Sequence, residues 1–322
     1  MKRILLIATG GTIASKNNGN GLTPSIDVNT LLEYIPSVRQ MCQITGISIM
    51  NIDSSNMNTV HIAAISECIK NNYNDYDGFV ITHGTDTCAY TAAALSYQLI
   101  NLSKPVILTG SQLPIDADGT DAILNLQNAF IYSCEDISGV FLAFCNKLIA
   151  GTCAKKIKTK SFDAFESINR PVIASIQDNK VLYNDYTFKK SSHANTNFHI
   201  ETDMCNNIAV INLFPGMNYN LLDYVNSSCR GIIIQGFGIG GIPDNITDYI
   251  HRLTTNGLCV VITTQCLYEG VNLDIYEVGR NLARAGIING KNMTVENLTM
   301  KLMWSLAHFN TVADVKDFME KE

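Results

Sequence analysis

The chain has 322 residues, which is enough for two domains that each bury a core of their own. Its 29 acidic and 23 basic residues give a formal net charge of −6 without a concentrated basic block, so the composition argues against nucleic acid and anionic membranes as partners and favours a small polar ligand. No secretory signal or membrane-spanning segment is recognisable, and the ten cysteines form no Cys-x-x-Cys pair, so a reduced, cytoplasmic location is expected.

The first predicted strand is the apolar run 4–8, which shows no polar alternation and is therefore expected to be buried on both faces of a parallel sheet. Two adjacent glycines follow it, flanked by Thr9 and Thr12. Ligands of open parallel sheets bind at the carboxyl ends of the strands, so Thr12 is a candidate site residue. The polar segment after it is predicted to form a lid, with Asn18, Gly19, Gly21, Leu22 and Thr23 as its residues.

Three more predicted strands in this half of the chain end in polar turns. The strand 44–49 leads to Asp53, Ser54 and Ser55, the strand 78–82 leads to Thr85 and Asp86, and the strand 105–109 leads to Ser111. Helices are predicted near 28–34, after Thr59 as the cap, from 88 to 95 and through 123–130. Strand ends that carry glycine beside a hydroxyl residue can face one crevice.

The remaining chain predicts a second sheet beyond a polar boundary. After a strand at 139–144, the stretch 155–161 holds four lysines, of which at least one is expected to point inward because apolar residues follow. The pattern becomes polar from about 177 to 205. Strands are predicted at 208–213, 231–234 and 258–263, with a helix at 244–256 closed by Gly257 and a last helix from Thr294.

This alternation predicts an α/β protein with two domains. The larger one is a doubly wound, flavodoxin-like domain over residues 1–188, the linker is 189–206, and a smaller parallel α/β domain covers 207–322.

Several familiar motifs are missing. The sequence contains no Walker loop and no Gly-x-Ser-x-Gly elbow. Gly236-x-Gly238-x-x-Gly241 matches the dinucleotide fingerprint formally, but Pro243 and the late start of the following helix argue against a pyrophosphate cradle. Phosphoryl transfer, serine-hydrolase chemistry and dinucleotide binding therefore lose their main support.

Four stretches together carry a resemblance to a known family: Thr9-Gly10-Gly11-Thr12-Ile13-Ala14, Asp53-Ser54-Ser55, Ile81-Thr82-His83-Gly84-Thr85-Asp86-Thr87 and Thr159-Lys160-Ser161. In order and spacing they resemble the motifs of bacterial L-asparaginases, and the Asp-Ser-Ser form resembles the cytoplasmic, type I branch. The resemblance covers nearly the whole chain. It implies hydrolysis of L-asparagine to L-aspartate and ammonia, no metal or organic cofactor, and a homodimer or homotetramer.

The resemblance also implies roles for single residues. Thr12 matches the nucleophile that forms an acyl-enzyme, and Thr85, Asp86 and Lys160 match a set that activates water or transfers protons. A lysine base requires a pKa lowered by burial or by a neighbouring cation. Backbone N–H groups of Gly11 and Thr85 are expected to form the oxyanion hole. Asp86 is expected to bind the substrate ammonium, and the other substrate-binding residues are Asp53, Ser54, Ser55 and Ser111.

The sequence departs from the family pattern at two places. Many members carry a tyrosine in the loop after the nucleophile, whereas residues 15–23 contain none. Cytoplasmic relatives can bind asparagine at a regulatory site through residues matching Thr159 and Cys266, but where they carry an arginine this chain has Gln235. Little or no cooperativity is therefore expected.

Three alternatives stay open at this point. The first is an amidohydrolase that prefers glutamine, and the second is the amide-releasing subunit of a tRNA-dependent amidotransferase. The latter usually has an extra N-terminal domain, whereas the first strand here begins at Ile4. The third is a non-catalytic amino-acid-binding sensor on the same fold.

Overall fold

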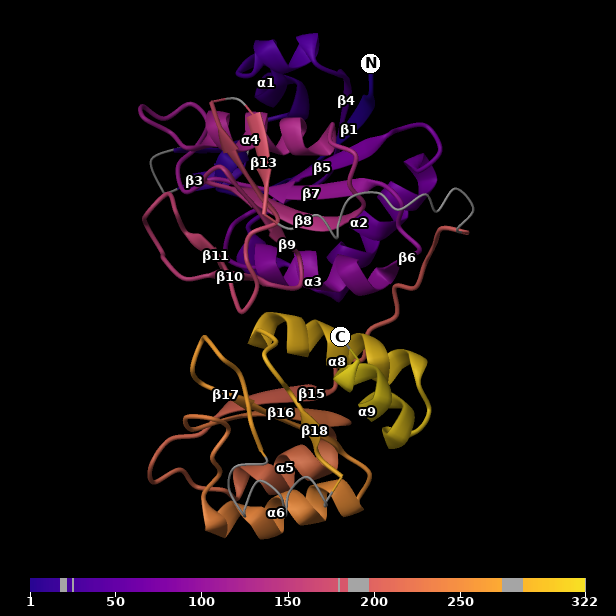
Figure 1. The fold of residues 1–322 in the computed structure, drawn as a ribbon, viewed down its shortest axis with the longest axis vertical. Coiled ribbons are helices and arrows are strands. Elements are labelled where there is room, and N and C mark those ends of the chain that lie inside the picture. Colours follow the sequence, from indigo (N-terminus) through magenta and orange to yellow (C-terminus); the bar gives the residue numbers. More distant parts are fainter. Residues whose placement is uncertain (18–21, 25, 179, 185–196, 274–285, 322) are drawn as a thin grey trace. The chain divides into compact units, whose positions relative to one another are not determined.

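The structure, a computed structural model, describes residues 1–17, 22–24, 26–178, 180–184, 197–273 and 286–321. By their internal contacts these form two compact units, Met1–Thr202 and Asp203–Glu322 (Figure 1). Each unit has its own sheet and its own helices, as the sequence predicts.

Unit 1 is built on an eight-stranded sheet in the order β13-β12-β9-β8-β7-β5-β1-β4. Its five parallel strands are β1 (Arg3–Gly10), β4 (Gln43–Ile52), β5 (Gly78–Thr82), β7 (Pro105–Thr109) and β8 (Gly139–Phe144). Numbered along the chain, these strands lie in the order 2-1-3-4-5, which is the flavodoxin-like arrangement. The fold class predicted for the larger domain is therefore confirmed.

The order of the parallel strands reverses beside β1. The chain passes from β1 outward to β4 and then returns to the other side of β1 to form β5. The pairing of Ala8 with Thr82 brings the carboxyl ends of β1 and β5 side by side. In open α/β sheets such a reversal point is where ligands bind.

Helices cover both faces of this sheet. Figure 1 shows α4 (Ala122–Ser133) on the side of α1 (Val28–Glu33), whereas α2 (Thr59–Asn72) and α3 (Cys88–Gln98) lie on the other side. The sequence pattern placed the cap of α2 at Thr59. In the structure Asn58 has this role, because its side-chain oxygen accepts hydrogen bonds from the N–H groups of Val60 and His61 at 3.1 Å each.

Short strands complete unit 1. The antiparallel extension of the sheet consists of β9 (Lys147–Ala150), β12 (Ala174–Gln177) and β13 (Lys180–Tyr183), and a separate hairpin pairs β10 (Ala154–Lys156) with β11 (Phe165–Ser167). Strand β6 (Leu99–Ile100) pairs with β14 (His199–Ile200), a strand that belongs to the stretch predicted as linker. Residues 189–196 of that linker lie outside the described residues.

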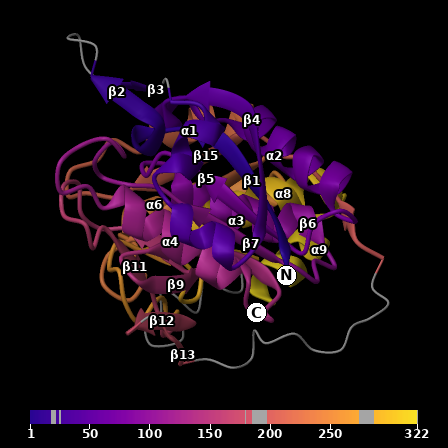
Figure 2. The ribbon, with the colours of Figure 1, turned by 90° about the horizontal axis from the view of Figure 1, so that it is seen from above.

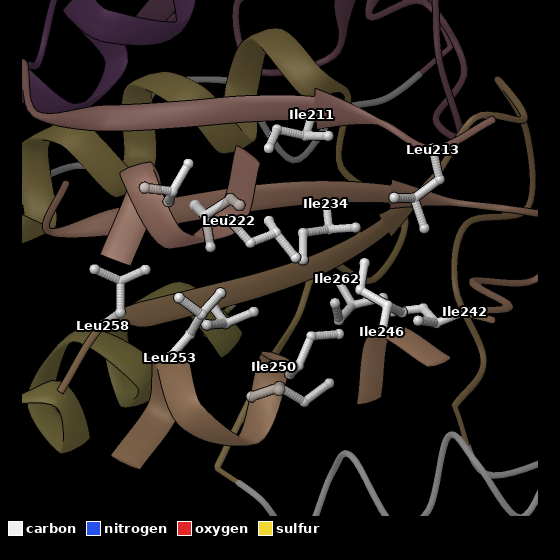
Figure 3. Close-up of a cluster of buried hydrophobic side chains, with 14 of the residues drawn as sticks. Ile211, Leu213, Leu222, Ile234, Ile242, Ile246, Ile250, Leu253, Leu258 and Ile262 are labelled. Atoms are coloured by element: carbon white, nitrogen blue, oxygen red, sulfur yellow. The ribbon is translucent and has the colours of Figure 1, made fainter. Parts of the chain in front are cut away.

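Unit 2 contains a four-stranded, fully parallel sheet. Its strands are β15 (Ile208–Asn212), β16 (Gly231–Gly236), β17 (Cys259–Thr264) and β18 (Ile288–Asn289), side by side in chain order. One face is covered by α5 (Leu221–Ser228) and α6 (Asp244–Thr255), whose apolar residues pack against the strands (Figure 3). The other face packs against α8 (Val295–His308) and α9 (Val312–Glu320). Helix α9 was not predicted, since the helix after Thr294 was expected to be the last.

The helices in the described part of the chain are too short or too polar to span a bilayer. None of them is long and apolar enough to cross a membrane.

Candidate active site

A small pocket of about 80 Å³ lies at the carboxyl ends of the central strands of unit 1. Its described walls come from the turns after β1, β4 and β5: Gly11, Thr12, Ser15, Asp53, Ser54, Gly84, Thr85 and Asp86. Five of the predicted site residues with functional side chains are therefore brought together at the reversal point of the sheet, namely Thr12, Asp53, Ser54, Thr85 and Asp86.

Glycines allow these turns to pack backbone against backbone. Gly11 has a φ of 81°, and a Cβ atom there would lie 2.4 Å from the backbone nitrogen of Gly84. A Cβ atom on Gly84 would lie 2.5 Å from the Ser54 hydroxyl oxygen. The three turns can meet at these distances only because both positions lack a side chain.

The short 3₁₀ helix η1 (Thr12–Ala14) begins directly after Gly11 and positions Thr12 on the wall of the pocket. The Ser15 hydroxyl, also on the wall, donates to the Gly11 carbonyl at 2.9 Å. The N–H of Gly11 donates to the carbonyl of Ile52 at 3.0 Å. Because this N–H is already used between β1 and β4, Gly11 is not the oxyanion donor that was expected from the sequence.

A lysine, a threonine and an aspartate form a connected set on one side of the pocket. The Lys156 ammonium donates to the Thr85 hydroxyl oxygen at 2.7 Å and to the Asp86 carboxylate at 2.6 Å. The Lys156 side chain is only 17% exposed, whereas that of Asp86 is 64% exposed. The set therefore runs from a shielded amine to a solvated carboxylate, and its threonine lines the pocket.

This geometry corrects the predicted set, in which Lys160 stood beside Thr85. Lys156 ends strand β10 and shares a face with the buried Ala154 two residues earlier, so it points inward. Beyond it the chain leaves strand β10, Lys158 pairs with Asp163 within the loop of the hairpin, and Lys160 is exposed. The inward lysine is thus four residues before the one predicted.

Two predicted substrate-binding residues do not line the pocket. Ser55 donates through its N–H and its hydroxyl to the Asp53 carboxylate at 2.9 and 2.8 Å, and these bonds hold the pKa of Asp53 below its usual value. Ser55 therefore orients Asp53 and does not face the pocket. Ser111 is buried, and its hydroxyl donates to the Leu113 carbonyl inside the turn after β7.

The His83 imidazole is fully buried and contacts the peptide that precedes Thr85. Its Nδ1 is 2.7 Å from the Gly84 carbonyl and its Nε2 is 2.9 Å from the Thr91 hydroxyl. A carbonyl can only accept, so the ring proton is on Nδ1 and the Thr91 hydroxyl donates to Nε2. The carbonyl of Gly84 is held toward the ring, and the N–H of the same peptide, that of Thr85, points the opposite way.

The predicted lid is only partly described. Asn18, Gly19 and Gly21 lie outside the described residues. Leu22 and Thr23 belong to β3 (Leu22–Pro24), which pairs antiparallel with β2 (Ser15–Asn17), and this hairpin extends away from the body of unit 1 (Figure 2). The role of this hairpin as a lid stays a prediction.

The residues predicted for a regulatory site belong to both units. Thr159 is an exposed residue of unit 1, whereas Gln235 on β16 and the exposed Cys266 belong to unit 2. Their grouping stays a prediction. In the described part of the chain, no cluster of three or more His, Cys, Asp or Glu side chains is placed to hold a metal ion.

The chain matches two family models, "Asparaginase, N-terminal" over residues 3–188 and "Glutaminase/Asparaginase C-terminal domain" over residues 207–319. It therefore belongs to the asparaginase family, and this membership supports an amidohydrolase activity.

Relatives and solved structures agree with this assignment. An L-asparaginase of Thermococcus kodakarensis is 35% identical, covering 99% of this chain and 97% of the relative. A subunit of the glutamyl-tRNA(Gln) amidotransferase of Pyrococcus furiosus is 34% identical over 98% of this chain and 74% of its own length.

Among solved structures, the thermostable L-asparaginase from Thermococcus kodakarensis superposes with a TM-score of 0.93 at 34% identity, covering 99% of this chain and 97% of that one. L-asparaginase I from Vibrio cholerae has a TM-score of 0.90 at 33% identity and covers 100% and 97%. A probable cytoplasmic L-asparaginase from Campylobacter jejuni has a TM-score of 0.84 at 25% identity and covers all of both chains.

Proposed function

We propose that the protein hydrolyses the side-chain amide of L-asparagine to give L-aspartate and ammonia, with Thr12 as the nucleophile. The observation that carries this proposal is that Thr12 lines the same pocket as Thr85, whose hydroxyl oxygen accepts a hydrogen bond from Lys156. Amide hydrolysis needs a nucleophile and a group that moves protons, and this pocket offers both.

In the first half-reaction, the Thr12 oxygen attacks the amide carbon and the carbon–nitrogen bond breaks, which leaves an ester on Thr12. The Thr12 proton passes to the Thr85 oxygen while Thr85 gives its own hydrogen to Lys156, a step that requires Lys156 as the neutral amine. The reverse path then delivers one proton to the departing nitrogen, so that ammonia leaves as a neutral molecule. The Thr85 N–H is the proposed donor to the developing oxyanion, because the His83 bond to the Gly84 carbonyl fixes that peptide.

In the second half-reaction, water attacks the ester carbon. Its proton passes to the Thr85–Lys156 pair, and the Thr12 oxygen takes a proton back as it leaves. Asp86 keeps the lysine in place through the 2.6 Å contact. Because the same pair serves both half-reactions, its loss is expected to reduce turnover more than binding.

The charges on the wall suit an α-amino acid. Asp86 and Asp53 are carboxylates that can receive the substrate ammonium, and the Ser54 hydroxyl is a donor for the substrate carboxylate. Ser54 is 3% exposed and packed against Gly84, so its position is well fixed.

The test is ammonia release from asparagine and from glutamine by wild type, Thr12→Ala and Thr12→Ser. We expect wild type to prefer asparagine and Thr12→Ala to lose activity by a factor on the order of 10³, because the nucleophile is gone. Thr12→Ser keeps a hydroxyl and should retain measurable turnover. Equal rates for wild type and Thr12→Ala would show that Thr12 is not the nucleophile.

A second candidate is the amide-releasing subunit of a tRNA-dependent amidotransferase. It is favoured by the relatives that are subunits of glutamyl-tRNA(Gln) amidotransferases, six of which match nearly the whole chain at 32 to 34% identity. The two functions differ in what the purified chain does alone. Efficient ammonia release without a partner protein or tRNA supports the asparaginase, whereas release that appears only with both added supports the second candidate.

The cellular setting proposed for this enzyme is the cytoplasm, with the chain assembled as a homodimer or homotetramer. The Campylobacter jejuni relative, described as probably cytoplasmic, supports the location. Sedimentation of the purified protein measures the assembly directly.

A further inference from the structure

A side chain from the turn after β7 contacts the pocket residue Thr85 without lining the pocket itself. Gln112 lies in this turn, and its Oε1 is 3.3 Å from the Thr85 hydroxyl. Its Nε2 donates to the backbone carbonyl of Ser161 at 3.2 Å. Gln112 thus connects Thr85 to the loop that joins β10 and β11.

These two contacts fix the orientation of the amide. The Ser161 carbonyl can only accept, so it requires the NH₂ group of Gln112 on its side. A flipped amide would bring two oxygens together there. The oxygen of the amide must therefore face Thr85, and the Thr85 hydroxyl donates its hydrogen to it.

The backbone of Gln112 is held as firmly as its side chain. Its N–H donates to the Asp121 carboxylate at 3.1 and 3.0 Å, and the next N–H, that of Leu113, donates to the same group at 3.1 Å. Asp121 is 8% exposed and also accepts from the Asn125 amide at 3.1 Å. A buried carboxylate at the start of α4 therefore sets where Gln112 stands.

The consequence concerns the direction of hydrogen bonding at Thr85. A hydroxyl has one hydrogen and two acceptor positions. Gln112 takes the hydrogen and the Lys156 ammonium fills one acceptor position at 2.7 Å. One acceptor position is left on the hydroxyl of a residue that lines the pocket.

We propose that Gln112 is a positioning residue that holds the Thr85 hydroxyl as a hydrogen-bond acceptor toward the pocket. In this state Thr85 can receive a hydrogen bond from the Thr12 hydroxyl or from the attacking water, which orients that nucleophile. In the transfer itself the Thr85 hydrogen moves from Gln112 to Lys156, which accepts it as the neutral amine. Without the Gln112 oxygen, the Thr85 hydrogen turns into the pocket and donates to whatever occupies it. This inference rests on the proposed function and deepens it.

The test compares two near-isosteric substitutions. Gln112→Met removes both hydrogen-bonding atoms, whereas Gln112→Glu keeps an acceptor for Thr85 and loses the donor to Ser161. Gln127→Met is the matched control. Gln127 is a half-buried glutamine on α4, and its side-chain Nε2 donates a hydrogen bond to the Ser37 hydroxyl at 3.3 Å.

For Gln112→Met we expect kcat with asparagine to fall about tenfold, the value of one neutral hydrogen bond, while KM stays within about twofold. The kcat of Gln112→Glu should be at least about threefold higher than that of Gln112→Met, and the kcat of Gln127→Met should match wild type. A lost structural contact would instead lower the melting temperature and affect Gln112→Met and Gln112→Glu alike.

Two results overturn the proposal: a kcat of Gln112→Met within about twofold of wild type, or a loss that Gln112→Glu does not relieve. A wild type that releases no ammonia from either amide would refute the proposed function itself, which separates the two failures.

Discussion

The two ring nitrogens of His83 are both hydrogen-bonded, and the neutral imidazole satisfies both bonds with its proton on Nδ1. A proton on Nε2 would require the Thr91 hydroxyl to turn from donor to acceptor, and it would place a charge on a fully buried ring. Burial lowers the pKa of His83 to about 4, with the Gly84 carbonyl opposing part of that shift. The folded state therefore favours the neutral form of His83, the residue that holds the peptide between Gly84 and Thr85.

This predicts a pH dependence of stability. The pKa of His83 is lower in the folded state than its ordinary 6.5, so the unfolded chain binds more protons between pH 6.5 and 4. The contribution is fully present above pH 6.5 and is lost as the pH falls through that window. A shift of this size corresponds to about 3 kcal/mol.

The measurement is the melting temperature of wild type and His83→Gln between pH 7 and pH 4. The variant should be less stable at pH 7 and should lose less on acidification, because its side chain does not titrate. His251→Gln, at an exposed position of α6, is the control and should follow wild type. Parallel curves for wild type and His83→Gln would contradict the prediction.

The hairpin of β10 and β11 determines which lysine enters the site. Its register pairs Lys156 with Phe165 and Lys155 with Glu166, so successive side chains alternate between an apolar and a polar side. Lys156 follows the buried side and reaches Thr85, whereas Lys160 lies in the exposed part of the loop. The choice of lysine follows from strand alternation.

We predict that Lys156→Met lowers kcat with asparagine by about a hundredfold or more, because a group that takes part in proton transfer is removed. Lys160→Met should stay within about twofold of wild type. Steady-state rates of the two variants measure this directly. A larger loss in Lys160→Met than in Lys156→Met would restore the lysine that the sequence motif indicated.

The same hairpin explains what the sequence could and could not predict. Strands β1, β5 and β7 are buried along nearly their whole length, so their apolar runs are clear in the sequence, and so are the polar turns that follow them. Strands β9 to β13 have three or four residues each, too few to show a period, and several carry lysine or glutamate. Because the sequence does not show that hairpin, the motif and the apolar residues after it indicate Lys160, whereas Lys156 is the lysine beside Thr85.

The starts of helices α2 and α9 are also hard to predict from the sequence. Asn58 and Thr59 are adjacent and both can cap a helix, and only the backbone shows that Asn58 is extended and Thr59 helical. Helix α9 has nine residues, and its cap is Thr311, which lies three residues after the end of α8. Such a short interval makes the two helices resemble one in the sequence.

At the scale of the molecule, the two sheets differ in strand order. In unit 1 the order reverses beside β1, and this reversal brings the turns after β1 and β5 together. In unit 2 the strands follow one another in chain order, so none of the described strands marks such a reversal. The topology alone therefore predicts that the chemistry belongs to unit 1, in agreement with the position of the pocket.

Unit 2 carries the residue that bears most directly on regulation, Gln235. Gln235 lies near the end of β16, where its carbonyl accepts from the Gln265 amide at 3.0 Å. The family resemblance implies an arginine at this position in regulated members, where it would bind the carboxylate of an effector asparagine. A neutral amide cannot make that bidentate, charge-assisted contact, which is worth roughly 1.5 to 3 kcal/mol.

We therefore predict that the initial rate rises hyperbolically with asparagine concentration, with a Hill coefficient close to one. The same measurement on Gln235→Arg asks whether an arginine at this position of β16 is enough to introduce a response to an effector. A clearly sigmoidal curve for wild type would contradict the prediction and would mean that the chain binds its effector through a contact other than the arginine. Cys266→Ala would then identify that contact, because sigmoidal kinetics that disappear in this variant place the effector beside the exposed thiol of unit 2.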